Sequence, residues 1–339
     1  MSTTAGYFDE TILNNIRVKA ENIMFDDRIK QQFDARYDVI KLINNIQTAN
    51  VYPSLARFQK KVAVDVMWQN VCGQDVEDNV NCTVGGDKSS TNLDTYTLSY
   101  EKVVNFSSSE NDFDDNEFDI QTAIAKQFLK ADKNLTEDFA QYAVGIIDAN
   151  AGWNTTSPEG KGDIVGADTY IAPAYWNASL AAYFSRVAIL NKFTSPVILS
   201  GTNLYEQMYV AAANNANANG KGDYILYGDM NLYFDLFNVD TVTTPNQNSY
   251  LISQGALAMA NRALHTDRVE VLHDWSRWRM PSRYLPNMYY DVFYETDCEY
   301  DRVIHKFKVK LVADVFVNPT GCDDNNTGIL SFTCGVDPS

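Results

Sequence analysis

The clearest pattern in the chain is a stripe of apolar residues that recur at three- and four-residue steps between positions 118 and 149. Such spacing predicts one amphipathic helix, because residues three and four apart share a helix face. The stripe consists of Ile120, Ala123, Ile124, Phe128, Leu135, Phe139, Tyr142, Ala143, Ile146 and Ile147. One helix over these 32 residues would be roughly 48 Å long, against a radius of gyration of ~20 Å for a compact chain. We therefore expect a strut along an elongated molecule, with 132–134 as the place where it could kink or split.

Two alternating runs predict a long β-hairpin. Residues 61–70, "KVAVDVMWQN", place valines and Trp68 on one side, and Tyr96–Tyr100 is a second alternating run. The span 71–94 between them is polar and contains Gly73, Gly85 and Gly86. A tip this hydrophilic does not pack in its own core, so we expect it to project.

The remaining patterns predict a mixed α+β fold. We expect helices near 177–191, from a face that includes Leu180 and Leu190, and over 201–214 and 255–264, with a strand at 196–200. The end of the chain alternates as strands at 289–296, 303–317 and 329–334. In the second of these, Phe307, Val309 and Leu311 face one way and Lys306, Lys308 and Lys310 the other.

Six carboxylates crowd into residues 110–119, directly before the long helix. Acidic residues at a helix start supply N-caps and favour the positive end of the helix dipole. A calcium loop is excluded, because Glu117 stands where the loop needs Gly and Ala123 stands where it needs Glu. We interpret the stretch as the acidic entry to the helix.

No catalytic motif stands out. The two "GKGD" copies, at 160–163 and 220–223, lack the spacing of a phosphate-binding loop and are interpreted as turns. His265, His273 and His305 form no metal-ligand or hydrolase motif. We therefore expect no cofactor, no metal and no catalytic residues, and keep a carboxylate-dependent, carbohydrate-acting enzyme as an alternative.

The net charge of −17 limits the partners. Residues 262–310 carry nine Lys/Arg against eight Asp/Glu, so the rest of the chain carries −18. A surface this acidic repels nucleic acid, which argues against a dedicated nucleic-acid reader. The polar start and the lack of an apolar window of ~18–20 residues predict a chain that is neither exported nor embedded in a membrane.

Aromatic and basic residues interleave at 274–286, "DWSRWRMPSRYLP". Such side chains dominate the centres of protein–protein interfaces. The alternative is an aromatic core edge whose arginines pair with nearby acids, and we place the interface slightly ahead of it. Nucleic acid is a clear third.

The order of these parts resembles the major capsid proteins of tailed bacteriophages, the Hong Kong ninety-seven type fold. The phrases "SPVILSGTNLYEQM" and "GDYILYGDMNLYFD" look like its axial-domain segments, and "HKFKVKLVADVFVNPTGCDDNNTGILSFTCG" looks like the tail of structural proteins from phages of Bacteroidetes-type hosts. The resemblance implies an N-terminal arm (1–58), an E-loop hairpin with acidic junction (59–115) and a peripheral domain with spine helix (116–193). It further implies an axial domain (194–286) and returning peripheral strands (287–339).

The same resemblance implies a virion protein without enzymatic activity, which forms hexamers and pentamers of an icosahedral shell around double-stranded DNA. Assembly would take place in the bacterial cytoplasm, with scaffolding, portal and decoration proteins as partners and no membrane. Another phage structural component, such as a tail or fibre protein, is the remaining alternative. The expected contact residues are Asn81, Asp87 and Lys88 at the hairpin tip, Asp114, Asp115 and Glu117 in the acidic stretch, and Trp275, Arg277, Trp278, Arg279, Arg283 and Tyr284.

Overall fold

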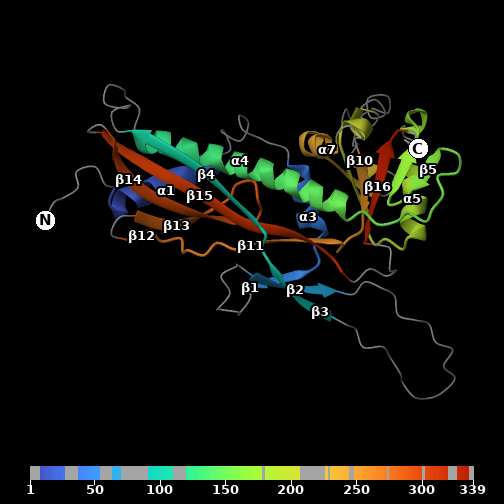
Figure 1. Cartoon of the computed structure of the whole chain (residues 1–339), viewed down its shortest axis with the longest axis horizontal. Helices are drawn as coiled ribbons and strands as arrows, with labels where there is room; N and C mark the ends of the chain where they lie inside the picture. Colours follow the sequence, from blue (N-terminus) through green and yellow to red (C-terminus); the bar gives the residue numbers. More distant parts are fainter. Residues whose placement is uncertain are drawn as a thin grey trace, which may run out of the picture.

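The computed structural model shows an elongated molecule with one long helix along its main axis (Figure 1). It describes residues 8–26, 37–53, 63–69, 91–109, 120–177, 180–206, 226–227, 230–243, 248–272, 275–299, 302–319 and 327–335. The named helices are α1 (Glu10–Met24), α3 (Asp38–Ile46), α4 (Ile120–Ala149), α5 (Leu180–Leu190) and α7 (Leu236–Val242), with a 3-10 turn η2 (Pro173–Tyr175).

Helix α4 is a single helix of 30 residues, or about 45 Å at about 1.5 Å per residue. The predicted strut is therefore confirmed, and it runs through 132–134 without a break. Its buried stripe includes Phe128, Leu135, Phe139 and Ile147, as the three- and four-residue spacing predicted. Helices α1 and α3 pack beside it in the largest hydrophobic core.

A six-stranded sheet lies under α4. Its main strand order is β11-β15-β14-β13-β12, and β4 pairs with β15. The strands are β4 (Tyr100–Ser109), β11 (Leu257–Asn261), β12 (Glu270–Val271), β13 (Trp275–Pro281), β14 (Tyr289–Glu299) and β15 (Arg302–Val317). The predicted faces of β15 are confirmed, because Phe307, Val309 and Leu311 are buried against the helices.

A seven-stranded sheet forms the other end of the molecule (Figure 1), in the order β5-β6-β16-β10-β7-β9-β8. The strands are β5 (Gly162–Val165), β6 (Asp168–Ile171), β7 (Val197–Ser200), β8 (Leu226–Tyr227), β9 (Met230–Phe234), β10 (Asn248–Ile252) and β16 (Ile329–Cys334). Helix α5 packs on it through Tyr183, Phe184 and Val187 in a separate core cluster. Both larger sheets take strands from before and after residue 286.

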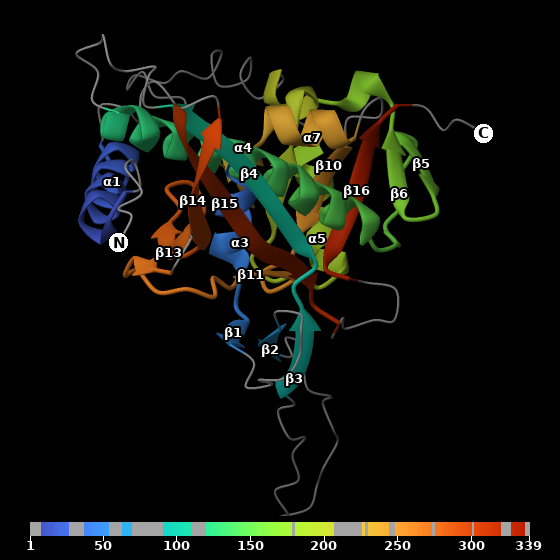
Figure 2. The ribbon, with the colours of Figure 1, turned by 60° about the vertical axis from the view of Figure 1, so that its left-hand side comes forward.

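A three-stranded sheet stands below the body (Figure 2) and consists of β1 (Asn50–Pro53), β2 (Ala63–Gln69) and β3 (Thr91–Thr97). β2 and β3 pair in antiparallel register, which confirms the base of the predicted hairpin. Val64, Val66 and Trp68 pack with Val312 and Phe316 of β15 in a third core cluster. The expected tip, 71–90, lies outside the described residues.

Three local predictions were wrong. Residues 257–261, expected to be helical, form β11, because pairing with β15 outweighs the helix propensity of an alanine-rich segment. The run Tyr96–Tyr100 is split, since β3 ends at Thr97 and β4 starts in another sheet at Tyr100. Leu190, expected on the buried face of its helix, is 61% exposed at the end of α5.

Candidate subunit interface

The six-stranded sheet has one face covered by helices and one face that is only half covered. Along β15, alternate residues from Phe307 to Val315 face α1 and α4. On the opposite face, Val312 and Phe316 lie under the three-stranded sheet. Lys306, Lys308 and Lys310 precede them on that face, where a groove of about 750 Å³ opens. Strand alternation therefore places these lysines away from the core.

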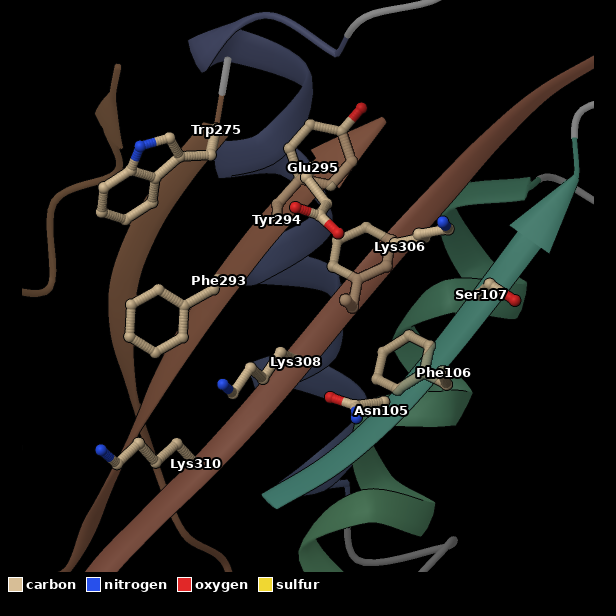
Figure 3. A pocket seen from close by; sticks show the side chains of 11 residues that line it. Asn105, Phe106, Ser107, Trp275, Phe293, Tyr294, Glu295, Lys306, Lys308 and Lys310 are labelled. Atoms are coloured by element: carbon tan, nitrogen blue, oxygen red, sulfur yellow. The ribbon is translucent and has the colours of Figure 1, made fainter. Parts of the chain in front are cut away.

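Four strands contribute to the groove (Figure 3). β4 supplies Asn105 and Ser107, β13 supplies Trp275, β14 supplies Phe293 and Glu295, and β15 supplies the three lysines. The register explains this gathering, because Lys308 lies opposite Phe293 on one side and opposite Asn105 on the other. The groove thus combines aromatic rings, cationic side chains and amide or hydroxyl groups.

The three lysines differ in their partners. Lys306 pairs with Asp297 at 2.5 Å, and Lys310 pairs with Glu101 at 2.6 Å. Lys308 is exposed and, within the described part of the chain, makes no ion pair; its ammonium group lies 5.9 Å from the centroid of the Phe293 ring. The middle lysine is therefore the one whose charge is open to a partner.

The predicted Trp/Arg segment is divided between the two faces of the sheet. Trp275 is 36% exposed and its ring lies 6.0 Å from that of Phe293 at the groove. Trp278, three residues later, is fully buried, with its ring 6.4 Å from that of Phe128 on α4. Trp278 is thus part of the core and Trp275 part of the surface.

The arginines of this segment have partners in their own chain. Arg277 pairs with Glu270 at 2.7 Å, and Arg279 pairs with Asp267 at 2.6 Å. The hydrogen bond from Arg279 holds the pKa of Asp267 below its ordinary value. Such pairing of the arginines with nearby acids is what the sequence suggested as the alternative to an interface. Because both guanidinium groups are paired within the chain, they are less free to bind a partner.

The last two predicted residues of the segment face the helices. Arg283 donates a hydrogen bond to the backbone carbonyl of Met24 at the end of α1, and its guanidinium lies 5.6 Å from the ring centroid of Tyr284. Tyr284 is partly buried and meets Tyr37 edge to face at 5.6 Å. Both residues thus tie the segment to the N-terminal helices.

The other six predicted contact residues cannot be placed. Asn81, Asp87, Lys88, Asp114, Asp115 and Glu117 lie outside the described residues. Of the predicted contact residues that the structure describes, only Trp275 lines the groove. Sequence reasoning missed Phe293, Glu295 and Asn105 as members of one site; the alternation of lysines on β15 was the one signal that pointed there.

Two observations on the described residues concern metal-binding and acid–base chemistry. No group of three or more His, Cys, Asp or Glu side chains among them could hold a metal ion. Burial raises the pKa of Asp132, but this carboxylate is enclosed and accepts hydrogen bonds from Tyr290, Ser282 and the Arg283 backbone. No helix in this part of the chain is both long and apolar enough to span a membrane.

No protein-family model and no curated protein matches the chain. Among solved structures, it is similar to one from Mycobacterium phage Che8, with a TM-score of 0.44 and 12% identity over 84% of this chain and 92% of that one. It is also similar to the capsid of cyanophage P-SCSP1u, at a TM-score of 0.42 and 10% identity over 85% of this chain and 84% of that one. The mature capsid of bacteriophage PhiM1 gives a TM-score of 0.42 and 10% identity over 85% of both chains. All three structures come from phages, and two of them are described as capsids.

Proposed function

We propose that the chain is the major capsid subunit of a tailed phage, which assembles into an icosahedral head around double-stranded DNA. The observation that carries the proposal is the combination of α4, about 45 Å long, with a three-stranded sheet that stands outside the body. An extended subunit with a half-covered sheet face leaves surface that neighbouring copies can bury.

The charge of the chain fits this function. A net charge of −17 keeps most of the subunit surface from binding DNA phosphates, which a container for DNA requires. We propose hexamers and pentamers of one chain, assembled in the host cytoplasm, with separate scaffolding, portal and decoration proteins. No cofactor is needed, because the function is the shell itself.

The expected parts of the subunit remain part of this proposal. We keep the bounds that the resemblance implies: a peripheral domain over 116–193 with α4 as its spine helix, an axial domain over 194–286 and returning peripheral strands over 287–339, with β2 and β3 at the base of the E-loop. The predicted contact residues at 81–88 and 114–117 would reach neighbouring subunits, as would Trp275 at the groove.

Electron microscopy of the expressed chain tests the proposal. The chain is imaged alone and again with the virion proteins encoded beside it, and its mass is measured by light scattering. Closed shells, or rings of five or six subunits, are the expected result. A monomer of about 38 kDa in both preparations would overturn the proposal, and tubes would assign the chain to a tail.

A further inference from the structure

We infer that the groove over β15 is a docking site for an acidic segment of a second copy of this chain, residues 110–119. This inference rests on the proposed self-assembly and names the two surfaces that meet. The groove supplies cations and aromatic rings, and the segment supplies carboxylates.

The spacing of charge on the groove suits an extended acidic peptide. Lys306, Lys308 and Lys310 stand at alternate positions of one strand, so they span about 14 Å at ~3.4 Å per residue. The outer two are held by Asp297 and Glu101, whereas Lys308 has no acidic partner among the described residues. An incoming carboxylate at the centre of the row would therefore gain an ion pair without displacing one.

The groove also offers apolar surface beside the charges. Trp275 and Phe293 lie 6.0 Å apart, ring to ring, and Trp275 is 36% exposed. Segment 110–119 contains six carboxylates, no basic residue, and the two rings of Phe113 and Phe118. It is thus complementary to the groove in both charge and apolar character.

Two observations favour a second copy over other occupants. Nucleic acid is disfavoured, because Arg277, Arg279, Lys306 and Lys310 are already neutralised by acidic partners. Outside residues 262–310 the chain carries a net charge of −18. A neighbouring copy therefore offers acidic surface that complements the lysines of the groove.

Isotope-mixed cross-linking tests the contact directly. Shells are assembled from equal amounts of ¹⁴N- and ¹⁵N-labelled chain, treated with a water-soluble carbodiimide, and digested for mass spectrometry. We expect a peptide pair that joins Lys308 to a carboxylate of 110–119 and carries one label of each kind. Shells that give only same-label pairs, or that link Lys308 to other carboxylates, overturn this inference and leave the proposed function intact. A chain that never assembles overturns both.

A charge-reversal series supplies an independent readout. Lys308→Glu is expected to lower the assembled fraction at least tenfold. Lys192→Glu, at an exposed lysine two residues after the end of α5, should assemble like wild type. Adding Asp115→Lys and Glu117→Lys to Lys308→Glu should restore assembly at least in part. Unchanged thermal unfolding shows that the variant subunits fold, and normal assembly of Lys308→Glu would refute the contact.

Discussion

The hydroxyl of Tyr290 on β14 donates a hydrogen bond to the carboxylate of Asp132 on α4, and both side chains are almost completely buried in the core. Ser282 and the backbone N–H of Arg283 donate to the same carboxylate at 2.7 and 2.9 Å. The bond therefore fixes the middle of the long helix to the sheet beneath it. Similar pairs join Asp138 to Tyr100 and Asp148 to Tyr250, so hydroxyl–carboxylate bonds recur along α4.

Asp132 should make the stability of the subunit depend on pH. Desolvation raises its pKa above the ordinary value of 3.8, although four hydrogen bonds act in the opposite direction. The folded state therefore holds this proton to higher pH than the unfolded state does. The stability from this group is fully present below the ordinary pKa and is lost as the pH rises through the folded-state value.

The measurement is urea unfolding of wild type and Asp132→Asn between pH 3.5 and neutral. Asn cannot ionise. The free energy of unfolding of Asp132→Asn should therefore fall less than that of wild type as the pH rises. Asp132→Ala, which leaves the Tyr290 and Ser282 donors without their acceptor, should be about 1–3 kcal/mol less stable than Asp132→Asn at every pH, because neither variant can ionise at this position. Parallel pH profiles of wild type and Asp132→Asn would contradict this account.

The two tryptophans of β13 should respond differently to truncation. Trp278→Ala removes a fully buried side chain and should cost about 3–5 kcal/mol of unfolding free energy. Trp278→Phe should cost clearly less, since the indole N–H has no hydrogen-bond partner among the described residues. Trp275→Ala should change thermal stability little and lower assembly, as seen by light scattering. Equal losses of stability at 275 and 278 would show that both belong to the core.

Two glycines offer a matched pair of alanine substitutions. Gly145 lies within α4 with nothing within 4 Å of an added Cβ, so Gly145→Ala should stabilise the chain by about 0.4–1 kcal/mol through helix propensity. At Gly162 of β5, an added Cβ would collide with the carbonyl oxygen of Tyr170 on β6. Gly162→Ala should therefore cost about 1–3 kcal/mol. Calorimetry distinguishes the two, and a destabilised Gly145→Ala would mean that this helix face is covered in solution.

Asp314 should hold the base of the hairpin in place. It accepts hydrogen bonds from the backbone and hydroxyl of Ser99 at 2.7 Å each, and from Tyr142 of α4 at 2.6 Å. Burial, followed by this bond, raises the pKa of Tyr142 to about 12. Asp314→Ala should speed hydrogen exchange in β3 at least tenfold more than in β14. A uniform increase over both strands would instead indicate global destabilisation.

Local periodicity predicted the long elements well but could not supply their partners. The stripe from Ile120 to Ile147 gave α4, and the alternation around Lys308 gave both faces of β15. The sequence pattern did not predict β11 as a strand. Ala258, Met259 and Ala260 are all buried, so the strand shows no alternation of polar and apolar residues. Its identity as a strand depends on β15, more than fifty positions later.

The groove was hidden for a similar reason. Lys306, Lys308 and Lys310 look equivalent in the sequence, and only the fold distinguishes them. Lys310 meets Glu101 across more than two hundred positions, while Lys308 meets no acid in the described residues. Likewise, Trp275 and Trp278 differ in role because three steps along a strand reverse the direction of the side chain.

The passage of the chain from β3 into β4 also has a mechanical consequence. β4 follows the hairpin after two residues and pairs with β15 at ten consecutive register positions, from Tyr100 with Ala313 to Ser109 with Ile304. A pull on the hairpin along its strands would load this ladder in shear, so that its hydrogen bonds resist together and do not open one after another. Tension applied at the hairpin would pass straight into the longest strand of the body.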